Sequence, residues 1–333
     1  MARITTADTP LAQLDRHWRR YLRAEGRSET TQRNYCLTLR HFASWLDAED
    51  LPNTPAEITP GDITDWLLDV TDRTSGANAA FHYRNLKAFY RWLTSARERA
   101  LRPGDSPMLE VPAPKYTEPV RATFDDGEVA RLIATCNPSR KGHRKSRSGR
   151  RYLDVRDEAI LRLFATTGMR LGGMSGLRYR EGVEDLDNKG LNDLFLDRSQ
   201  PLVRLRLKGG ETHFYPIWPK AAVALDLYLR HRATRAHADS PHLWIGGHGG
   251  LGAQGIHYMI KRRAERAGIQ RRIHAHMFRR EVTKQLLDGD TDRAMIAQYM
   301  GWKDVRHVAL YASESEQRRA WTAASKVPLE ATG

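Results

Sequence analysis

A cluster of prolines divides this chain into two parts. Five prolines fall within residues 101–119: Pro103, Pro107, Pro112, Pro114 and Pro119. Proline fixes its own φ angle and lacks an amide donor, so prolines at this density exclude a helix and extend the chain. With 333 residues, the chain is long enough for two domains. We therefore expect one domain over residues 1–115, ending in a proline-rich linker, and a second over residues 116–333.

Apolar residues recur at helical spacing in the first part. The first of four predicted helices carries Leu11, Leu14 and Trp18, and the second starts near Ser28. The third begins at Thr59-Pro60, a capping residue followed by proline at the first helical position, and the fourth runs from about residue 75 to residue 93. The aromatic residues along these helices are typical of a core. A small helical domain is expected.

The second part mixes helices with strands. Residues 202–208 alternate apolar and basic side chains, Gly209-Gly210 follows, and residues 211–217 form a second alternating run, which predicts a hairpin. A helix is expected to begin near Thr123, where Asp126 fits a capping box. Further helices are predicted over residues 154–167, 219–235, 255–267, 276–287, 291–300 and 304–311, with a last segment over 314–325. The fold class is therefore mainly α with a small antiparallel β element.

Positive charge is concentrated in the second part. The net charge is +14, and residues 1–115 carry 16 Lys and Arg against 15 Asp and Glu, whereas residues 116–333 carry 38 against 25. Residues 139–151 alone hold seven basic residues and no acidic one, as in a solvated loop or one that orders on a phosphate backbone. This asymmetry indicates a polyanionic partner, with nucleic acid as the first choice.

Several classes of protein are excluded by what the sequence lacks. It contains no apolar run of membrane-spanning length and no leader of the signal-peptide type, so we expect a cytoplasmic protein with no membrane partner. Two cysteines cannot form a disulfide scaffold, and His274 and His276 have no third ligand at metal spacing. A phosphate-binding loop of the ATPase type is missing. We therefore expect neither a metal nor a cofactor.

A few residues in the second part could act on a phosphate. His276 and Arg279 are three apart at a predicted helix start, so they share a face near free backbone amides that favour an anion. Histidine can transfer protons near neutral pH, and arginine can bind phosphate with two hydrogen bonds. Arg170 follows Thr-Gly-Met, and Tyr311 lies nine residues after Trp302. Taken singly, each residue is more often structural than functional.

Together these motifs resemble the tyrosine recombinases, also called the phage integrase family. Thr-Gly-Met-Arg resembles the family's first arginine block, Lys208 starts a hairpin like that of its catalytic lysine, and His276-x-x-Arg279 resembles its second block. Trp302 stands where most members have histidine and some have tryptophan. The helical N-terminal part resembles the core-site-binding domain. The resemblance covers about residues 9–325.

The resemblance implies DNA cleavage and rejoining without a metal or ATP. Tyr311 would attack the scissile phosphate and form a 3′-phosphotyrosine, while Lys208 would protonate the leaving 5′-oxygen. Arg170 and Arg279 would hold the non-bridging oxygens, His276 would assist proton transfer, and Trp302 would donate its indole N–H. The partners would be double-stranded DNA recombination sites, with a homotetramer on two sites. The segment 314–325 would then pack on a neighbouring subunit.

Three departures from the family pattern point to a divergent recombinase of a mobile element. Gly173 stands where the family usually has Glu or Asp, Arg280 where histidine often follows the second arginine, and Trp302 cannot carry a proton. Since Gly173 has no carboxylate, another group must orient Arg170. Three alternatives are a topoisomerase-like enzyme with the same chemistry, a non-catalytic DNA-binding regulator, and a basic RNA-binding protein; neither of the last two needs the full residue set.

Overall fold

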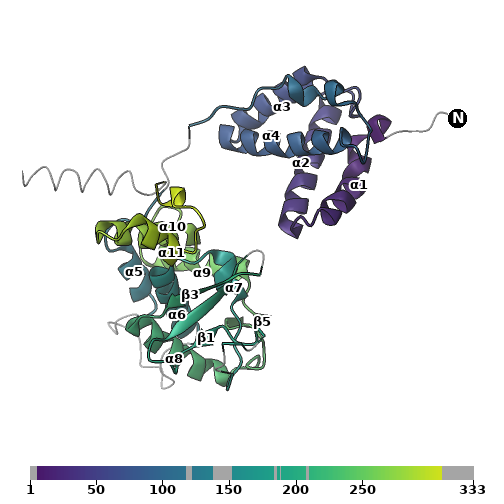
Figure 1. Ribbon diagram of the computed structural model, residues 1–333. Coiled ribbons are helices and arrows are strands. Elements are labelled where there is room, and N and C mark those ends of the chain that lie inside the picture. Colours follow the sequence, from purple (N-terminus) through teal and green to yellow (C-terminus); the bar gives the residue numbers. More distant parts are fainter. Residues whose placement is uncertain are drawn as a thin grey trace, which may run out of the picture. The chain divides into compact units, whose positions relative to one another are not determined.

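The computed structural model describes residues 6–117, 122–137, 152–183, 186–187, 189–207 and 210–309. The chain divides into two compact units, Met1–Arg121 and Ala122–Gly333, which are described separately below (Figure 1). Lys208, Tyr311, the basic stretch 139–151 and the segment 314–325 lie outside the described residues.

The first unit contains the four predicted helices. They are α1 (Leu11–Ala24), α2 (Glu29–Ala48), α3 (Pro60–Arg73) and α4 (Gly76–Leu93). The side chains of Ser28 and Ser75 cap α2 and α4, and Thr59 forms a reciprocal capping box with Asp62 at the start of α3. These local signals fix where the helices begin, and they explain why the sequence alone predicts them.

Aromatic side chains fill the core of this unit. Trp18 of α1 packs edge-on against Phe89 and lies 5.0 Å from Trp92, both on α4, measured between ring centroids. Two short 3-10 helices, Pro103–Asp105 and Pro107–Leu109, follow α4. Met108 and Val111 are buried in the same core, so the first half of the proline-rich segment is part of this unit.

Among its described residues, the second unit contains seven further helices: α5 (Glu128–Ala134), α6 (Tyr152–Thr167), α7 (Leu171–Gly176), α8 (Pro219–Ala233), α9 (Ala253–Arg266), α10 (Ala275–Asp288) and α11 (Arg293–Tyr299). The predicted helix start near Thr123 was wrong, because α5 begins five residues later. The Glu128 carboxylate accepts a hydrogen bond from the Asp125 amide and pairs with Arg271, a contact that local sequence does not reveal. The six-residue α7 was not predicted.

Two small antiparallel sheets complete this unit. Strands β1 (Leu194–Phe195), β2 (Leu202–Arg206) and β3 (Thr212–Pro216) form one sheet in that order, with Arg204 opposite Phe214. The predicted hairpin is thus confirmed by the antiparallel pairing of β2 and β3, which runs from Leu202 opposite Pro216 to Arg206 opposite Thr212. Strands β4 (Ile245–Gly246) and β5 (Gly249–Gly250) pair across a two-residue turn.

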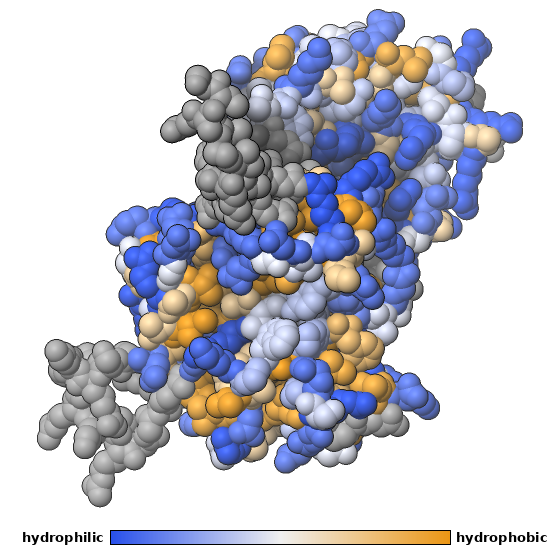
Figure 2. Space-filling model, turned by 60° about the vertical axis from the view of Figure 1, so that its left-hand side comes forward, coloured by the Kyte–Doolittle hydropathy of each residue, from blue (hydrophilic) through white to orange (hydrophobic). Residues whose placement is uncertain are grey.

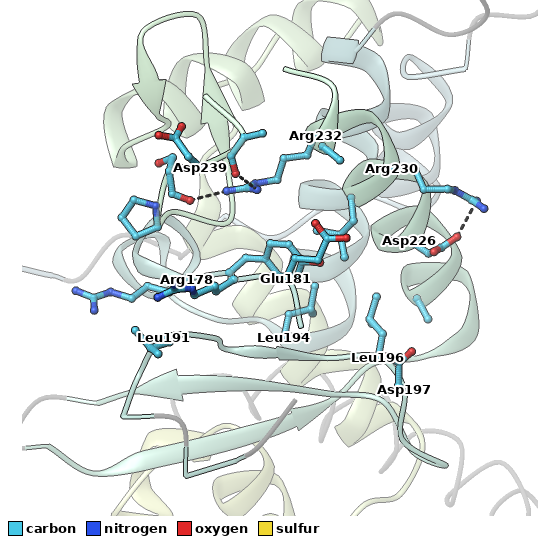
Figure 3. Close-up of a pocket in the computed structure, with 18 of the residues that line it drawn as sticks. Arg178, Glu181, Leu191, Leu194, Leu196, Asp197, Asp226, Arg230, Arg232 and Asp239 are labelled. Carbon is cyan, nitrogen blue, oxygen red and sulfur yellow. Dashed lines mark hydrogen bonds and ion pairs between the residues drawn. The ribbon is translucent and has the colours of Figure 1, made fainter. Parts of the chain in front are cut away.

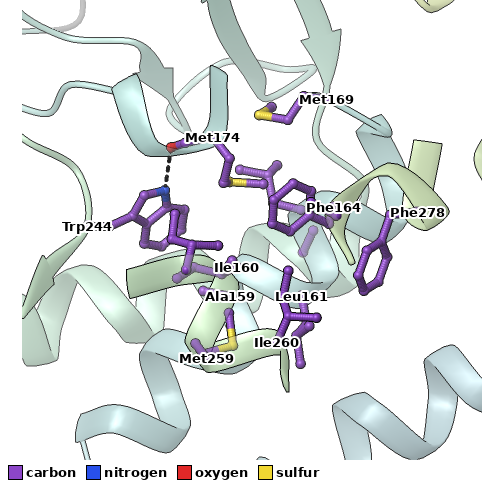
Figure 4. Close-up of a cluster of buried hydrophobic side chains, with 14 of the residues drawn as sticks. Ala159, Ile160, Leu161, Phe164, Met169, Met174, Trp244, Met259, Ile260 and Phe278 are labelled. Atoms are coloured by element: carbon purple, nitrogen blue, oxygen red, sulfur yellow. Dashed lines mark hydrogen bonds between the residues drawn. The ribbon is translucent and has the colours of Figure 1, made fainter. Parts of the chain in front are cut away.

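The core of the second unit surrounds α6. Phe164 of α6 stacks on Phe278 of α10, and Ile160 and Leu161 are fully buried (Figure 4). The indole N–H of Trp244 donates to the Met174 carbonyl of α7 over 2.9 Å, which joins α7 to this core (Figure 4). Helix α6 therefore holds α10 and the turn that precedes α7 in fixed places.

Hydrophilic residues cover most of the face seen in Figure 2, with apolar patches between them. No helix in the described ranges is long and apolar enough to cross a membrane.

Candidate active site

A tight turn between α6 and α7 presents Arg170. Gly168 has φ +58°, a left-handed conformation that L side chains rarely adopt. A Cβ at this position would lie 3.1 Å from the Arg279 Cα and 2.9 Å from the Met300 Cε, so the turn packs directly on α10. Arg170 follows as the N-terminal flanking residue of α7, and its side chain is exposed. The glycine therefore lets the turn that carries Arg170 pack against the backbone of Arg279.

Arg279 is buried at the centre of the site. Only 2% of the residue is exposed. Its Nη1 donates to the Gly168 carbonyl over 3.1 Å, and its Nη2 donates to the Met300 carbonyl over 2.7 Å. A buried guanidinium needs such acceptors, because an unpaired charge in the interior is costly. Arg279 thus connects the Arg170 turn, α10 and the end of α11.

Trp302 lies against the same guanidinium. Gly301, at φ +64°, ends α11, and the Trp302 amide donates to the Ala297 carbonyl over 2.8 Å. The Arg279 guanidinium carbon lies 4.7 Å from the centroid of the Trp302 ring, within the range of a cation–π contact. The Trp302 ring also stacks on His307. Two predicted site residues that are 23 positions apart in the sequence are therefore in contact.

His276 is one turn before Arg279 on α10 and is exposed. Its neighbour His274 has a pKa below the ordinary value. Burial lowers this pKa most, and the positive charges of Arg280, His276 and Arg272 lower it further. Arg272 and Arg280 thus place positive charge around the N-terminal end of α10, where a phosphate could bind.

The hairpin that carries Lys208 is tied to the segment after Trp302. The Leu207 amide donates to the Glu211 carbonyl over 2.7 Å and closes the turn. The Glu211 carboxylate forms a 2.6 Å ion pair with Lys303. Lys208 itself lies outside the described residues, as does Tyr311. Their proximity to the arginines stays a prediction.

Two residues at this site were not predicted from the sequence. His213 and Tyr215 of β3 reach the end of α11: the His213 Nε2 is 2.9 Å from the Tyr299 carbonyl, and the Tyr215 hydroxyl donates to the Met300 carbonyl over 3.3 Å. Alternation on a strand places residues 213 and 215 on one face. That alternation was visible in the sequence, but the element facing it was not.

A cavity of the second unit lies away from these residues. About 1030 Å³ in volume, it is bordered by Leu191, Leu194 and Leu196 on one side and by Arg232 (Figure 3). Arg232 donates to the backbone carbonyls of Ala238 and Ser240, so its charge is satisfied within the fold. None of the described candidate residues lines this cavity.

Comparison with known proteins identifies the family. A model of the phage integrase family matches residues 123–318, which is more than half of the chain, and a phage integrase N-terminal SAM-like domain matches residues 14–97. The chain belongs to the phage integrase family. The family resemblance and the fold class inferred from the motifs are both confirmed.

Relatives and solved structures of the family cover most of this member. It is 27% identical to tyrosine recombinase XerD of Lacticaseibacillus casei, over 89% of this chain and 92% of that protein. It is also 27% identical to tyrosine recombinase XerC of Corynebacterium efficiens, over 88% and 84%. The fold is similar to that of XerH recombinase bound to difH, with a TM-score of 0.69 and 15% identity over 94% and 84% of the two chains. These names agree with the predicted enzyme class, a tyrosine recombinase.

This integrase-family member departs from the family pattern at positions that the structure explains in part. A Cβ on Gly173 would overlap the Cδ1 methyl of Leu205 in β2, so an acidic side chain at that position requires Leu205 to move. Arg280 donates through Nη1 to the Ala122 carbonyl over 2.7 Å and fixes the chain that leads into α5. The space for one acidic group is thus taken by a leucine.

The SAM-like unit of this family member contains a cavity lined by basic residues. The net charge of residues 1–115, which is close to zero, gave no indication of it. About 590 Å³ in volume, it lies between α1 and α2. Five arginines line it together with Glu29 and Gln32: Arg16, Arg19, Arg20, Arg23 and Arg33. Net charge reports a sum, whereas folding decides which charges share a surface.

Proposed function

We propose that this protein is a site-specific DNA recombinase that cleaves and rejoins DNA strands through a 3′-phosphotyrosyl intermediate. The observation that carries the proposal is the meeting of three separate segments at one buried guanidinium. Arg279 bonds to the Gly168 carbonyl beside Arg170, bonds to the Met300 carbonyl, and contacts Trp302. The relatives that cover nearly the whole chain bear the name tyrosine recombinase.

In the proposed reaction, the Tyr311 hydroxyl attacks the scissile phosphorus. The new bond joins the tyrosine oxygen to phosphorus, and the bond to the 5′-oxygen of the next nucleotide breaks. Lys208 gives a proton to that leaving oxygen, and His276 accepts the phenol proton. Rejoining reverses these steps with a 5′-hydroxyl as nucleophile. No ATP is consumed, because the phosphotyrosyl ester retains the bond energy.

Arg170 and Arg279 supply the electrostatic stabilisation of the transition state. Negative charge grows on the non-bridging oxygens as tyrosine attacks, and fixed cationic donors bind that charge most strongly where water is excluded. Arg279 is held by two carbonyls before substrate arrives, so little reorganisation is needed during the reaction. Trp302 adds an indole N–H as a neutral donor.

The proposed assembly is a homotetramer on two double-stranded DNA sites. Residues 1–115, with the proline-rich linker at their end, bind the core site, and residues 116–333 form the catalytic domain. Lambda integrase has been solved as a tetramer on a Holliday junction, and an integrase of transposon Tn1549 with transposon-end DNA, each with a TM-score of 0.61 to this chain. We further propose that the protein belongs to a mobile element, because Gly173, Arg280 and Trp302 depart from the usual pattern, and that it acts on DNA in the cytoplasm.

The test is covalent capture on a nicked suicide substrate built from the sequences that flank the gene. Wild type should form a protein–DNA adduct, and Tyr311→Phe should form none while binding the same DNA. Tyr299→Phe is the matched control: the Tyr299 hydroxyl donates to the Thr166 carbonyl, so its loss should leave the adduct intact.

The alternatives predict different results in the same assay. An adduct that persists in Tyr311→Phe would show that another residue is the nucleophile. Wild type that binds the DNA but forms no adduct would favour a non-catalytic regulator. Relaxation of a supercoiled plasmid that carries no second site, without strand exchange, would favour the topoisomerase-like alternative.

A further inference from the structure

Two side chains of strand β3 form hydrogen bonds with successive backbone carbonyls at the end of α11. His213 meets the Tyr299 carbonyl, and two residues along the strand Tyr215 meets the Met300 carbonyl. A side chain on Gly301 would approach the His213 ring within 3.3 Å, so the histidine also packs on the glycine that ends α11. The peptide that leads to Trp302 is therefore held from one face of β3.

The Met300 carbonyl links strand β3 to Arg279, the proposed phosphate-binding arginine, because it accepts a hydrogen bond from each. Its oxygen accepts from the Tyr215 hydroxyl over 3.3 Å and from the Arg279 Nη2 over 2.7 Å. A carbonyl oxygen has two lone pairs, and here both are used. If the tyrosine bond is removed, the carbonyl is free to rotate, and one of the two described anchors of Arg279 loosens with it.

Tyr215 is suited to this task because it stays protonated. The residue is 1% exposed. Burial raises the pKa of its phenol, and the charges of Arg279 and Arg170 act in the opposite direction. Its hydroxyl therefore remains a hydrogen-bond donor to the Met300 carbonyl that Arg279 also uses.

We propose that Tyr215 is a positioning residue for Arg279, and that His213 secures the same turn. The proposal rests on the proposed function. The described hydrogen bonds of the Arg279 guanidinium go to two backbone carbonyls, and the neutral hydroxyl of Tyr215 shares one of them. Tyr215 does not touch the DNA; it acts through Met300 and Arg279.

The experiment measures the single-turnover rate of adduct formation on the suicide substrate. The protein concentration is kept above the dissociation constant of the protein–DNA complex, so that all of the substrate is bound. Tyr215→Phe should lower the rate about three- to tenfold, the usual effect of one neutral hydrogen bond. DNA affinity should change by less than about twofold, and the melting temperature should fall by less than about 4 °C.

Tyr228→Phe is the matched control. Tyr228 is also fully buried in the second unit, and its hydroxyl donates to the Leu243 carbonyl over 2.9 Å. This variant should lose stability but retain the wild-type rate below its melting temperature. A similar rate loss in both variants would mean that the effect is structural, and the positioning role would be wrong.

A double-variant cycle tests whether the effect passes through Arg279. In an Arg279→Lys background, Tyr215→Phe should lower the rate by less than about twofold, since the single nitrogen of lysine cannot reach the Gly168 and Met300 carbonyls as the two Nη atoms of arginine do. The same fold loss in both backgrounds, or a full rate in Tyr215→Phe alone, would overturn the proposal. A wild type that forms no adduct refutes the proposed function itself, and the positioning role with it.

His213 provides a second route if Tyr215→Phe folds poorly. Glutamine can still donate to the Tyr299 carbonyl, whereas leucine of similar size cannot. His213→Gln should retain more of the adduct rate than His213→Leu, at matched melting temperatures. Equal rates in these two variants would contradict the role of β3.

Discussion

At the scale of single residues, the site depends on how a buried cation is satisfied. Arg279 reaches carbonyls of Gly168 and Met300, which belong to segments before α7 and after α11. Such bonds to neutral carbonyls fix a guanidinium in position and leave its positive charge intact, whereas carboxylates would neutralise it. The charge of Arg279 therefore remains available to a phosphate, and a lysine could not reproduce both contacts.

The role of Lys208 can be tested on the leaving group. Lys208→Ala should slow cleavage of ordinary DNA by at least about 100-fold, the lower range for loss of a general acid. A 5′-phosphorothiolate at the scissile position should restore most of the rate, because sulfur leaves without a proton. Adduct formation on the two substrates is the measurement. If the sulfur substrate gives no rescue, Lys208 only contacts the phosphate and another group is the acid.

At the scale of elements, the first unit contains a buried polar contact between α2 and α4. His82 of α4 lies 2.9 Å from the Thr38 hydroxyl of α2, and the Asn85 amide donates to that hydroxyl over 2.8 Å. Burial, and to a smaller extent the neighbouring His41, lower the pKa of His82 to about 4. The network therefore requires a neutral imidazole.

This requirement predicts a loss of stability in acid. The unfolded chain protonates His82 near pH 6.5, whereas the folded chain resists protonation down to about pH 4. The stabilisation is complete above pH 6.5 and falls as the pH drops towards 4, by at most about 1.4 kcal/mol per pH unit. The free energy of unfolding is measured by urea titration at pH 7 and at pH 5. Unfolding of α2 and α4 is detected by a hydrogen-exchange pulse that is applied at the same pH in both series. His82→Gln should reduce the difference; an unchanged difference would assign it to other groups.

At the scale of the whole molecule, charge is distributed in two ways. The second part of the chain carries most of the net positive charge, and the first unit carries a local cluster of arginines between α1 and α2. Each phosphate that these cations neutralise releases counterions, so DNA affinity should fall steeply with salt. Both units are expected to contribute to that slope.

Substitution of the α1 cluster should change the salt slope. Arg20→Gln with Arg23→Gln should make the slope of log affinity against log salt shallower by about 0.9 for each phosphate that the protein no longer neutralises. The control, Arg73→Gln with Arg99→Gln, removes the same charge from positions outside the cavity; Arg73 pairs with Asp69, and Arg99 bonds to the Ala96 carbonyl. Fluorescence anisotropy over a salt series measures both. Equal slopes in the two double variants would exclude the cavity as a DNA-binding surface.

The sequence by itself determined the elements whose signals are local. Thr59 and Asp62 form the capping box at the start of α3, and the two alternating runs around residue 210 form the paired strands β2 and β3. The order and spacing of Arg170, His276, Arg279 and Trp302 also indicated the family. Such features depend on neighbours within a few residues, so a linear pattern contains them.

Only the tertiary structure decided what surrounds each of these residues. Arg279 and Gly168 are 111 positions apart, and Tyr215 and Met300 are 85 apart, yet they form one hydrogen-bonded network. Leu205 fills the space beside Gly173, and Arg271 pairs with the Glu128 that begins α5. These partners are chosen by packing in a dense interior, where side-chain volumes and hydrogen-bond acceptors from distant segments must fit together at the same time.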